Sequence, residues 1–225
     1  MNAQQLPLAV SLPVAETFAT WVGGGNTDAV AMLTSSQQPL VYLWGPSGVG
    51  KSHLLHALCA EYSQLIYLPL AELKGVVDAK CLRGLENYAW VCLDDIDAVL
   101  ADPDWCHELF TLYNRIDDQG STKLVVTAKQ APAQLTVHLA DLKSRLQWGL
   151  TLHIQALDDS HKVRAIQLRA QAMGLSLSTD TAQFMVQRLH RDLPSLINAL
   201  ERLDQASIVA KRALTTPFVK AVLEL

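Results

Sequence analysis

The strongest constraint on the fold is an eight-residue segment that follows an apolar run. The segment is Gly45-Pro46-Ser47-Gly48-Val49-Gly50-Lys51-Ser52, and it fits the pattern G-x-x-x-x-G-K-[ST] at every fixed position. The apolar run 40–44 stands directly before it, and a helical pattern over residues 52–61 follows. A strand, a glycine-rich turn and a helix in this order form the context in which the pattern binds phosphate. We call residues 45–52 the phosphate loop and predict a nucleotide-binding α/β domain around it.

The residue types in the phosphate loop suit phosphate binding. Glycines let backbone N–H groups turn inward around phosphate oxygens, and the helix that follows directs its positive end toward them. Lys51 is predicted to reach the terminal phosphates of a nucleotide, and the Ser52 hydroxyl is predicted to ligate Mg²⁺. The nucleotide contacts predicted from this part of the chain are Gly48, Val49, Gly50, Lys51, Ser52 and His53.

Two aspartates follow another apolar run and supply the hard anion that a Mg²⁺–phosphate site needs. Asp94 is predicted to contact Mg²⁺ through a water molecule, and Asp95 is the candidate that orients an attacking water. In fast ATPases of this architecture a glutamate usually stands at this position, and the Asp95 side chain is one methylene shorter. The sequence therefore predicts slow intrinsic hydrolysis of a bound nucleotide.

Five short apolar runs indicate a sheet that is buried on both faces. Each run is continuous rather than alternating, which is typical of strands in a parallel sheet. Helical patterns at 52–61, 104–119 and 139–146 lie between them. This arrangement predicts an α/β fold with a five-stranded, mostly parallel sheet. The runs are 40–44, 65–68, 89–93, 124–127 and 150–154.

The character of the chain changes after residue 154. Apolar residues now recur at helical spacing, and Gly174 is predicted to end the first helix of this region. Thr216 and Pro217 are predicted to be the N-cap and the first residue of a last short helix. The chain is accordingly divided into an N-terminal tether, residues 1–14, an α/β core, residues 15–155, and a small all-helical lid domain, residues 156–225.

Composition excludes several classes of protein. Of the 225 residues, 50% are hydrophobic and 18% are charged, which argues against disorder. The net charge of −4 argues against a broad DNA-gripping surface, so we expect no strong direct DNA binding. The charge is uneven, because residues 160–225 hold 9 of the 18 Lys and Arg residues but only 5 of the 22 Asp and Glu residues. Trp44, Trp90 and Trp148 adjoin expected strands and are predicted to lie in or near the core.

Signals for export, membrane insertion and zinc binding are not found in the sequence. Neither a signal peptide nor an apolar run long enough to span a membrane is present, so no membrane partner is expected. The four cysteines form no C-x-x-C pair, and the seven histidines lack metal-ligand spacing. These features favour a cytoplasmic protein with reduced thiols.

Several segments together resemble the AAA+ ATPases. The phosphate loop, the strand end Asp94-Asp95-Ile96-Asp97 and the helical domain after a five-strand core carry the general resemblance. Lys143-Ser144-Arg145-Leu146-Gln147-Trp148-Gly149-Leu150 resembles the arginine-finger box of DnaA-type initiators. Thr17-Phe18-Ala19-Thr20-Trp21-Val22 with Gly23-Gly24-Gly25-Asn26 resembles their base-enclosing linker. Over nearly its whole length the chain is similar to the Hda-like, DnaA-related AAA+ proteins, which act in regulatory inactivation of DnaA.

This resemblance implies a site and two protein partners. ADP or ATP with Mg²⁺ would lie between core and lid, with Trp21 and Val22 near the base and Arg191 contacting the phosphates. Arg145 would act in trans as a finger on ATP bound to the DnaA initiator, so that the protein promotes hydrolysis there and represses replication initiation. A short N-terminal motif would dock on the DNA polymerase sliding clamp (the β subunit), and its matching residues are Gln5, Leu6 and Leu8.

Two other functions remain open at this point. The first is an autonomous AAA+ ATPase or helicase-loader-like protein, in which a homo-oligomer places Arg145 on a neighbour's nucleotide. The second is a small-molecule P-loop kinase, which would need an acceptor pocket within the core. Nucleotide-dependent self-assembly with rapid turnover would favour the first, and metabolite-dependent phosphotransfer would favour the second.

Overall fold

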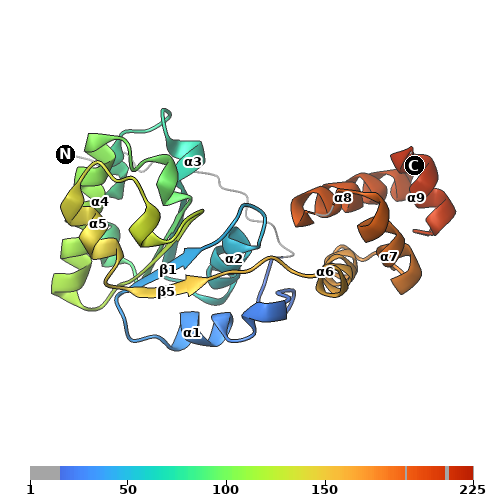
Figure 1. The fold of residues 1–225 in the computed structure, drawn as a ribbon, viewed down its shortest axis with the longest axis horizontal. Helices are drawn as coiled ribbons and strands as arrows, with labels where there is room; N and C mark the ends of the chain where they lie inside the picture. Colours follow the sequence, from blue (N-terminus) through green and yellow to red (C-terminus); the bar gives the residue numbers. More distant parts are fainter. Residues whose placement is uncertain (1–15, 191, 211–212, 225) are drawn as a thin grey trace.

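The computed structural model describes residues 16–190, 192–210 and 213–224, and these form two parts that lie beside each other (Figure 1). Within these residues, an α/β core contains all five strands, and a cluster of four helices follows it. One segment after the last strand carries the chain from the core to these helices (Figure 1).

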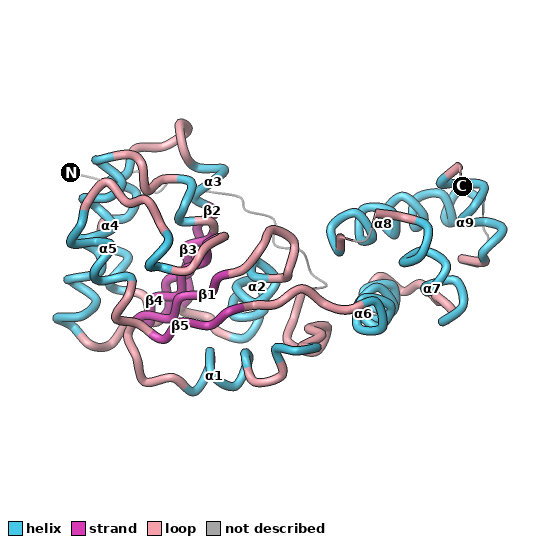
Figure 2. Tube along the Cα trace, in the orientation of Figure 1, coloured by secondary structure: helices cyan, strands magenta, loops and turns pink. Residues whose placement is uncertain are grey.

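The five strands form one parallel sheet in the order β2-β3-β4-β1-β5 (Figure 2). Each strand lies within one or two residues of an apolar run in the sequence, so the expected sheet is confirmed. The phosphate loop follows the strand β1 and Asp95 follows β3, so both lie at the carboxyl edge of the sheet. The strands are β1 (Leu40–Trp44), β2 (Leu65–Pro69), β3 (Trp90–Asp94), β4 (Lys123–Ala128) and β5 (Leu150–His153).

Helices cover both faces of the sheet, and alternate residues of β1 belong to two different hydrophobic clusters. Leu40 and Tyr42 pack with α4 and α5, whereas Val41 and Leu43 pack with α1 and α2. All four side chains are fully buried, which explains why the run is continuously apolar. The core helices are α1 (Ala29–Ser35), α2 (Lys51–Glu61), α3 (Leu70–Leu73), α4 (Pro103–Gln119) and α5 (Ala140–Leu146), with 3-10 turns at Gly24–Asn26, Ala79–Leu82, Leu85–Asn87, Ile96–Ala98 and Pro132–Gln134.

The helices after β5 have a hydrophobic cluster of their own, and we call them the lid. They are α6 (Asp159–Ala172), α7 (Thr179–Arg188), α8 (Leu193–Ala210) and α9 (Thr216–Leu223). The expectation for the start of α9 was wrong by one residue. The side chain of Thr215, not Thr216, accepts the hydrogen bond from the N–H of Phe218, so Thr216 is already helical.

The prediction that Trp148 lies in or near the core is also wrong, because its side chain is exposed. It is 67% exposed and stacks on the guanidinium of Arg145, 5.0 Å from Cζ to the ring centroid. Trp148 follows the end of α5 and precedes β5 by one glycine, so it lies outside the sheet.

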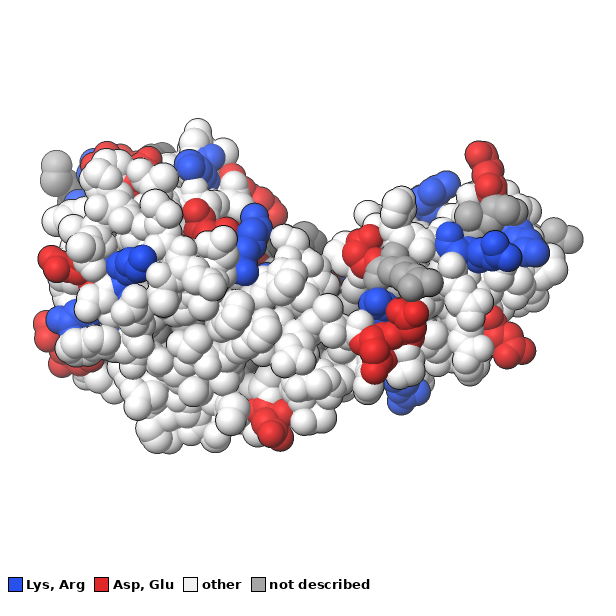
Figure 3. Space-filling model, viewed as in Figure 1, with Lys and Arg blue, Asp and Glu red and all other residues white. Residues whose placement is uncertain are grey.

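The surface view shows acidic and basic side chains in small groups separated by uncharged surface on the core (Figure 3). Among the helices in the described part of the chain, none has the length and apolarity needed to cross a membrane.

Candidate functional site

Lys51 is held inside the phosphate loop at the start of α2. Its side chain is buried, and Nζ donates hydrogen bonds to the carbonyl oxygens of Gly45 at 2.9 Å and Pro46 at 3.0 Å. Burial lowers the pKa of Lys51, while the carboxylates of Asp95 and Asp94 act in the opposite direction. The loop therefore fixes a cation beside the position that a phosphate group would take.

Asp94 and Asp95 stand where β3 ends, beside the end of β4. Asp94 is buried and accepts hydrogen bonds from the Tyr67 hydroxyl at 2.9 Å and from the hydroxyl of Thr127. The N–H of Asp95 donates to the same Thr127 oxygen at 2.8 Å. Both carboxylate oxygens of Asp94 thus have protein partners, which fits a contact to Mg²⁺ through water better than direct ligation.

Asp95 combines a left-handed backbone with a raised carboxyl pKa. Its backbone is left-handed, with φ 52° and ψ 51°, a region that few non-glycine residues adopt and that costs of order 1–3 kcal/mol. Burial, and then the charges of Asp94 and Asp97, raise the pKa of its carboxyl group. A higher pKa makes Asp95 a better proton acceptor toward a water molecule.

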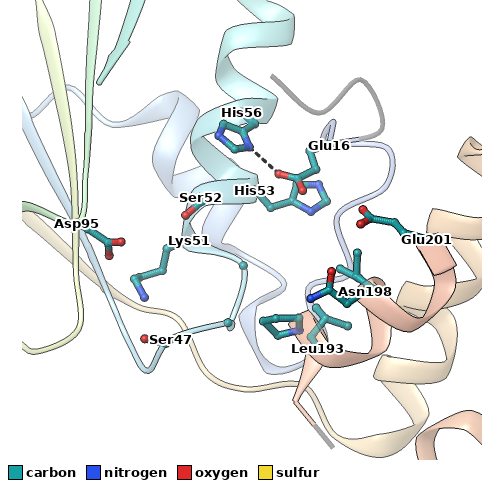
Figure 4. Close-up of a pocket in the computed structure, with 14 residues that line it drawn as sticks. Glu16, Ser47, Lys51, Ser52, His53, His56, Asp95, Leu193, Asn198 and Glu201 are labelled. Carbon is teal, nitrogen blue, oxygen red and sulfur yellow. Dashed lines mark hydrogen bonds and ion pairs between the residues drawn. The ribbon is translucent and has the colours of Figure 1, made fainter. Parts of the chain in front are cut away.

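A cavity of about 420 Å³ lies between the phosphate loop and the first turns of α8. Its volume falls in the range of small-ligand sites. Lys51 and Asp95 face it from the core, and Leu193 and Asn198 face it from the lid (Figure 4). The lining is Glu16, Ser47, Gly48, Gly50, Lys51, Ser52, His53, His56, Asp95, Leu193, Pro194, Ile197, Asn198 and Glu201.

Glycines allow two close approaches to the phosphate loop. A Cβ at Gly48 would lie 2.7 Å from the Pro194 ring of the lid, and a Cβ at Gly50 would lie 2.6 Å from Cζ3 of Trp21. The Trp21 ring also meets His53 edge-on, with ring centroids 5.6 Å apart. The second and third glycines of the motif therefore admit the lid and the indole of Trp21, respectively.

The sequence-predicted nucleotide contacts do not all line the cavity. Gly48, Gly50, Lys51, Ser52 and His53 do, whereas Trp21, Val22 and Val49 do not. Arg191 lies outside the described residues, as do Gln5, Leu6 and Leu8.

The lid residues that line the cavity were not predicted from the sequence, and neither were Glu16 and His56 on its core side. Asn198 and Glu201 are one turn apart on α8, a helical spacing that would have suggested a shared face. Glu16 immediately precedes the linker-like segment, but nothing in the sequence pairs it with residues of α2.

Arg145 lies on α5 and does not line the cavity. Its guanidinium is 5.5 Å from the centroid of Tyr113 and 5.0 Å from that of Trp148, and NH1 lies 3.9 Å from a carboxylate oxygen of Asp117. These contacts hold a partly exposed cation at the surface of the core.

No cluster of three or more His, Cys, Asp or Glu side chains suited to a metal ion occurs among the residues that the structure describes. Of the two residues predicted to serve Mg²⁺, Ser52 lines the cavity and Asp94 does not.

Two family models match adjoining parts of the chain. The model described as the bacterial DnaA ATPase domain matches residues 79–153, and the model described as the Hda lid domain matches residues 159–223.

Solved structures support the same fold. Domain III of the Thermotoga maritima replication initiation protein DnaA superposes with a TM-score of 0.78 at 19% identity, covering 95% of this chain and 97% of that chain. AMPPCP-bound DnaA from Aquifex aeolicus gives 0.66 at 18% identity, covering 85% and 66%. The Thermotoga maritima RuvB branch migration motor gives 0.70 at 18% identity, covering 95% and 72%.

Proposed function

This chain belongs to the Hda-like, DnaA-related AAA+ proteins, and from that premise we propose that it is a nucleotide-binding regulator of the initiation of DNA replication. In this proposal it binds ADP or ATP between core and lid, acts in the cytoplasm, and promotes hydrolysis of ATP bound to DnaA. The core would comprise residues 15–155 and the lid residues 156–225.

The observation that carries the proposal is that Arg145 stands apart from the cavity beside its own phosphate loop. An arginine that does not line the cavity of its own chain can contact a nucleotide bound to another protein. Tyr113 and Trp148 keep its guanidinium on the surface, where a partner can meet it. An arginine finger stabilises charge on the transferred phosphoryl group and can contribute about 10³–10⁵ in rate.

The cavity supports nucleotide binding by this chain itself. Lys51 supplies a fixed cation and α2 an N-terminus directed toward it. When bound, Mg²⁺ would neutralise phosphate charge, with Ser52 as a ligand and Asp94 contacting it through water. The short side chain of Asp95 supports slow turnover, so the bound nucleotide would serve mainly to organise core and lid.

Recruitment to DNA is the remaining part of the proposal. Gln5, Leu6 and Leu8 would dock on the sliding clamp, with the glutamine amide fixing one end by hydrogen bonds and the leucines filling an apolar groove. A protein with a net charge of −4 would then reach DNA through a partner rather than through a basic surface of its own.

One assay tests both the arginine finger and the clamp docking: it measures hydrolysis of DnaA-bound ATP in the presence of clamp-loaded DNA. We expect Arg145→Ala to abolish the stimulation because the transition-state cation is lost, while clamp pull-down stays unchanged. Arg188→Ala, an exposed arginine of α7, is the matched control and should stimulate normally. Full stimulation by Arg145→Ala would refute the finger.

The same assay separates docking from chemistry. Gln5→Ala should lose both clamp pull-down and stimulation, whereas the neighbouring Gln4→Ala should keep both. If Gln5→Ala still binds the clamp like the unmodified chain, the docking motif is wrong and the finger proposal stands alone. Rapid ATP turnover by this chain alone, dependent on Arg145, would favour the self-assembling ATPase instead.

A further inference from the structure

A group of charged side chains from the core and the lid meets beside the cavity. Arg169, on α6 of the lid, places NH1 3.6 Å from Oε1 of Glu16 and NH2 3.7 Å from Oε1 of Glu201. Glu16 belongs to the core and also contacts His56 Nδ1 at 2.6 Å (Figure 4). One guanidinium thus stands between a carboxylate of the core and a carboxylate of α8.

The contact between Glu16 and Arg169 is largely shielded from water. The Arg169 side chain is 14% exposed and that of Glu16 is 17% exposed, and Nε of Arg169 is buried with no hydrogen-bond partner among the described residues. Burial alone would raise the pKa of Glu16, but the hydrogen bond with His56 and the charges of His56, His53 and Arg169 bring it below its usual value. Glu16 is therefore an anion at neutral pH, and its attraction to Arg169 is screened less than at a surface pair.

The contact between Glu16 and Arg169 joins the core to the lid, so it can restrict motion of one part relative to the other. Glu16 lines the cavity from the core and Glu201 lines it from the lid, and Arg169 contacts both without lining the cavity itself. The covalent connection from β5 to α6 is a single segment, seen in Figure 1 as the path between the two parts. Two parts linked in this way move relative to each other unless contacts across the interface hold them.

We propose that Arg169 is a positioning residue that clasps the lid to the core through Glu16, while Glu201 of α8 orients its guanidinium from within the lid, and that it thereby sets the rate at which nucleotide leaves the cavity. The proposal rests on the nucleotide binding proposed above. Arg169 itself does not line the cavity, so its effect on the nucleotide is exerted through the lid. A planar guanidinium can face two carboxylates at once, which a lysine ammonium does less well.

The test is the release rate of a fluorescent ADP analogue, measured by stopped flow with the full chain. Arg169→Met removes the charge while keeping an apolar stem, and we expect release about tenfold faster. Arg169→Lys should give an intermediate rate. Arg164→Met, at an exposed arginine on the same helix, is the matched control and should release at the original rate. Circular dichroism confirms that each variant is folded.

Salt dependence separates a clasp from a general packing defect. Raising NaCl from about 0.1 M to about 1 M shortens the Debye length from about 10 Å to about 3 Å. The ratio of the Arg169→Met rate to the original rate should then fall, but by less than for an exposed pair, because the Glu16–Arg169 contact is largely shielded from water. A ratio that stays constant with salt, or equal rates at low salt, would overturn the clasp.

A second measurement separates this idea from nucleotide binding itself. Small-angle X-ray scattering without nucleotide should give a larger radius of gyration for Arg169→Met than for the unmodified chain and Arg164→Met. If the unmodified chain fails to bind the ADP analogue, the proposed function fails, and the scattering alone decides the clasp. Equal radii in that case would overturn it.

Discussion

Gly50 is the residue at which backbone geometry and packing constrain the phosphate loop together. Its φ is +98°, and a Cβ would lie 2.6 Å from Trp21. Gly120 offers a matched comparison, because its φ is +66° but a Cβ there would meet nothing within 4 Å. We expect Gly120→Ala to lower the free energy of unfolding by about 1 kcal/mol for the left-handed backbone alone. Gly50→Ala should lower it by roughly 3 kcal/mol, since the overpacking adds to the same strain. Urea unfolding midpoints measure both, and equal losses would contradict the Trp21 contact.

Some residues of the candidate site can be predicted from the sequence, and others cannot. Lys51 and Ser52 could be placed in the site because they end the phosphate-loop pattern that follows β1, and Asp95 because it directly follows β3. Parallel strands bring their carboxyl ends to one edge of the sheet. Glu16 and Arg169 could not be predicted, because their contact depends on how two separately folded parts meet. Trp148 was misplaced for a related reason: an aromatic side chain beside a strand is usually core, but here a guanidinium provides the partner.

At the scale of elements, the helix α6 begins with a cap that makes its stability depend on pH. The backbone N–H of His161 donates to Asp158 Oδ1 at 2.8 Å. Together with hydrogen bonds from Ser160 and the His161 ring, this lowers the pKa of Asp158 from 3.8 to about 2. Because the pKa is lower in the folded state, the cap stabilises the lid fully above the ordinary pKa. That contribution is lost as the pH falls toward the folded value.

We therefore expect Asp158→Asn, which keeps an oxygen acceptor but does not titrate, to weaken the pH dependence of unfolding. The urea midpoint, followed by circular dichroism at about pH 5 and about pH 3, should shift less than in the unmodified chain. Asp159→Asn, one residue further on and inside the helix, is the matched control. An unchanged shift in Asp158→Asn would remove the cap from the explanation.

Most elements could be predicted because local chemistry marks them. Continuous apolar runs located all five strands, and helical spacing located the lid. The ends were less certain, as α9 illustrates: Thr215 and Thr216 are both good capping residues, and only the hydrogen bond to Phe218 selects the first.

For the whole molecule, the nucleotide would act as a ligand that binds only when core and lid are both folded and in contact. A ligand at 100 times its dissociation constant adds about 2.7 kcal/mol to the stability of the folded state. For a chain of this size, that corresponds to a rise of roughly 5–10 °C in melting temperature.

The Lys51 cation faces the cavity and is fixed by the loop carbonyls, so much of this stabilisation should depend on it. We expect Lys51→Ala to lose most of the ADP-dependent rise, measured against its own melting temperature without ADP. Lys80→Ala, at an exposed lysine paired with Asp78, should keep the full rise. A normal rise in Lys51→Ala would mean that the cavity does not hold the phosphates. A loss in both variants would instead indicate a general effect of charge.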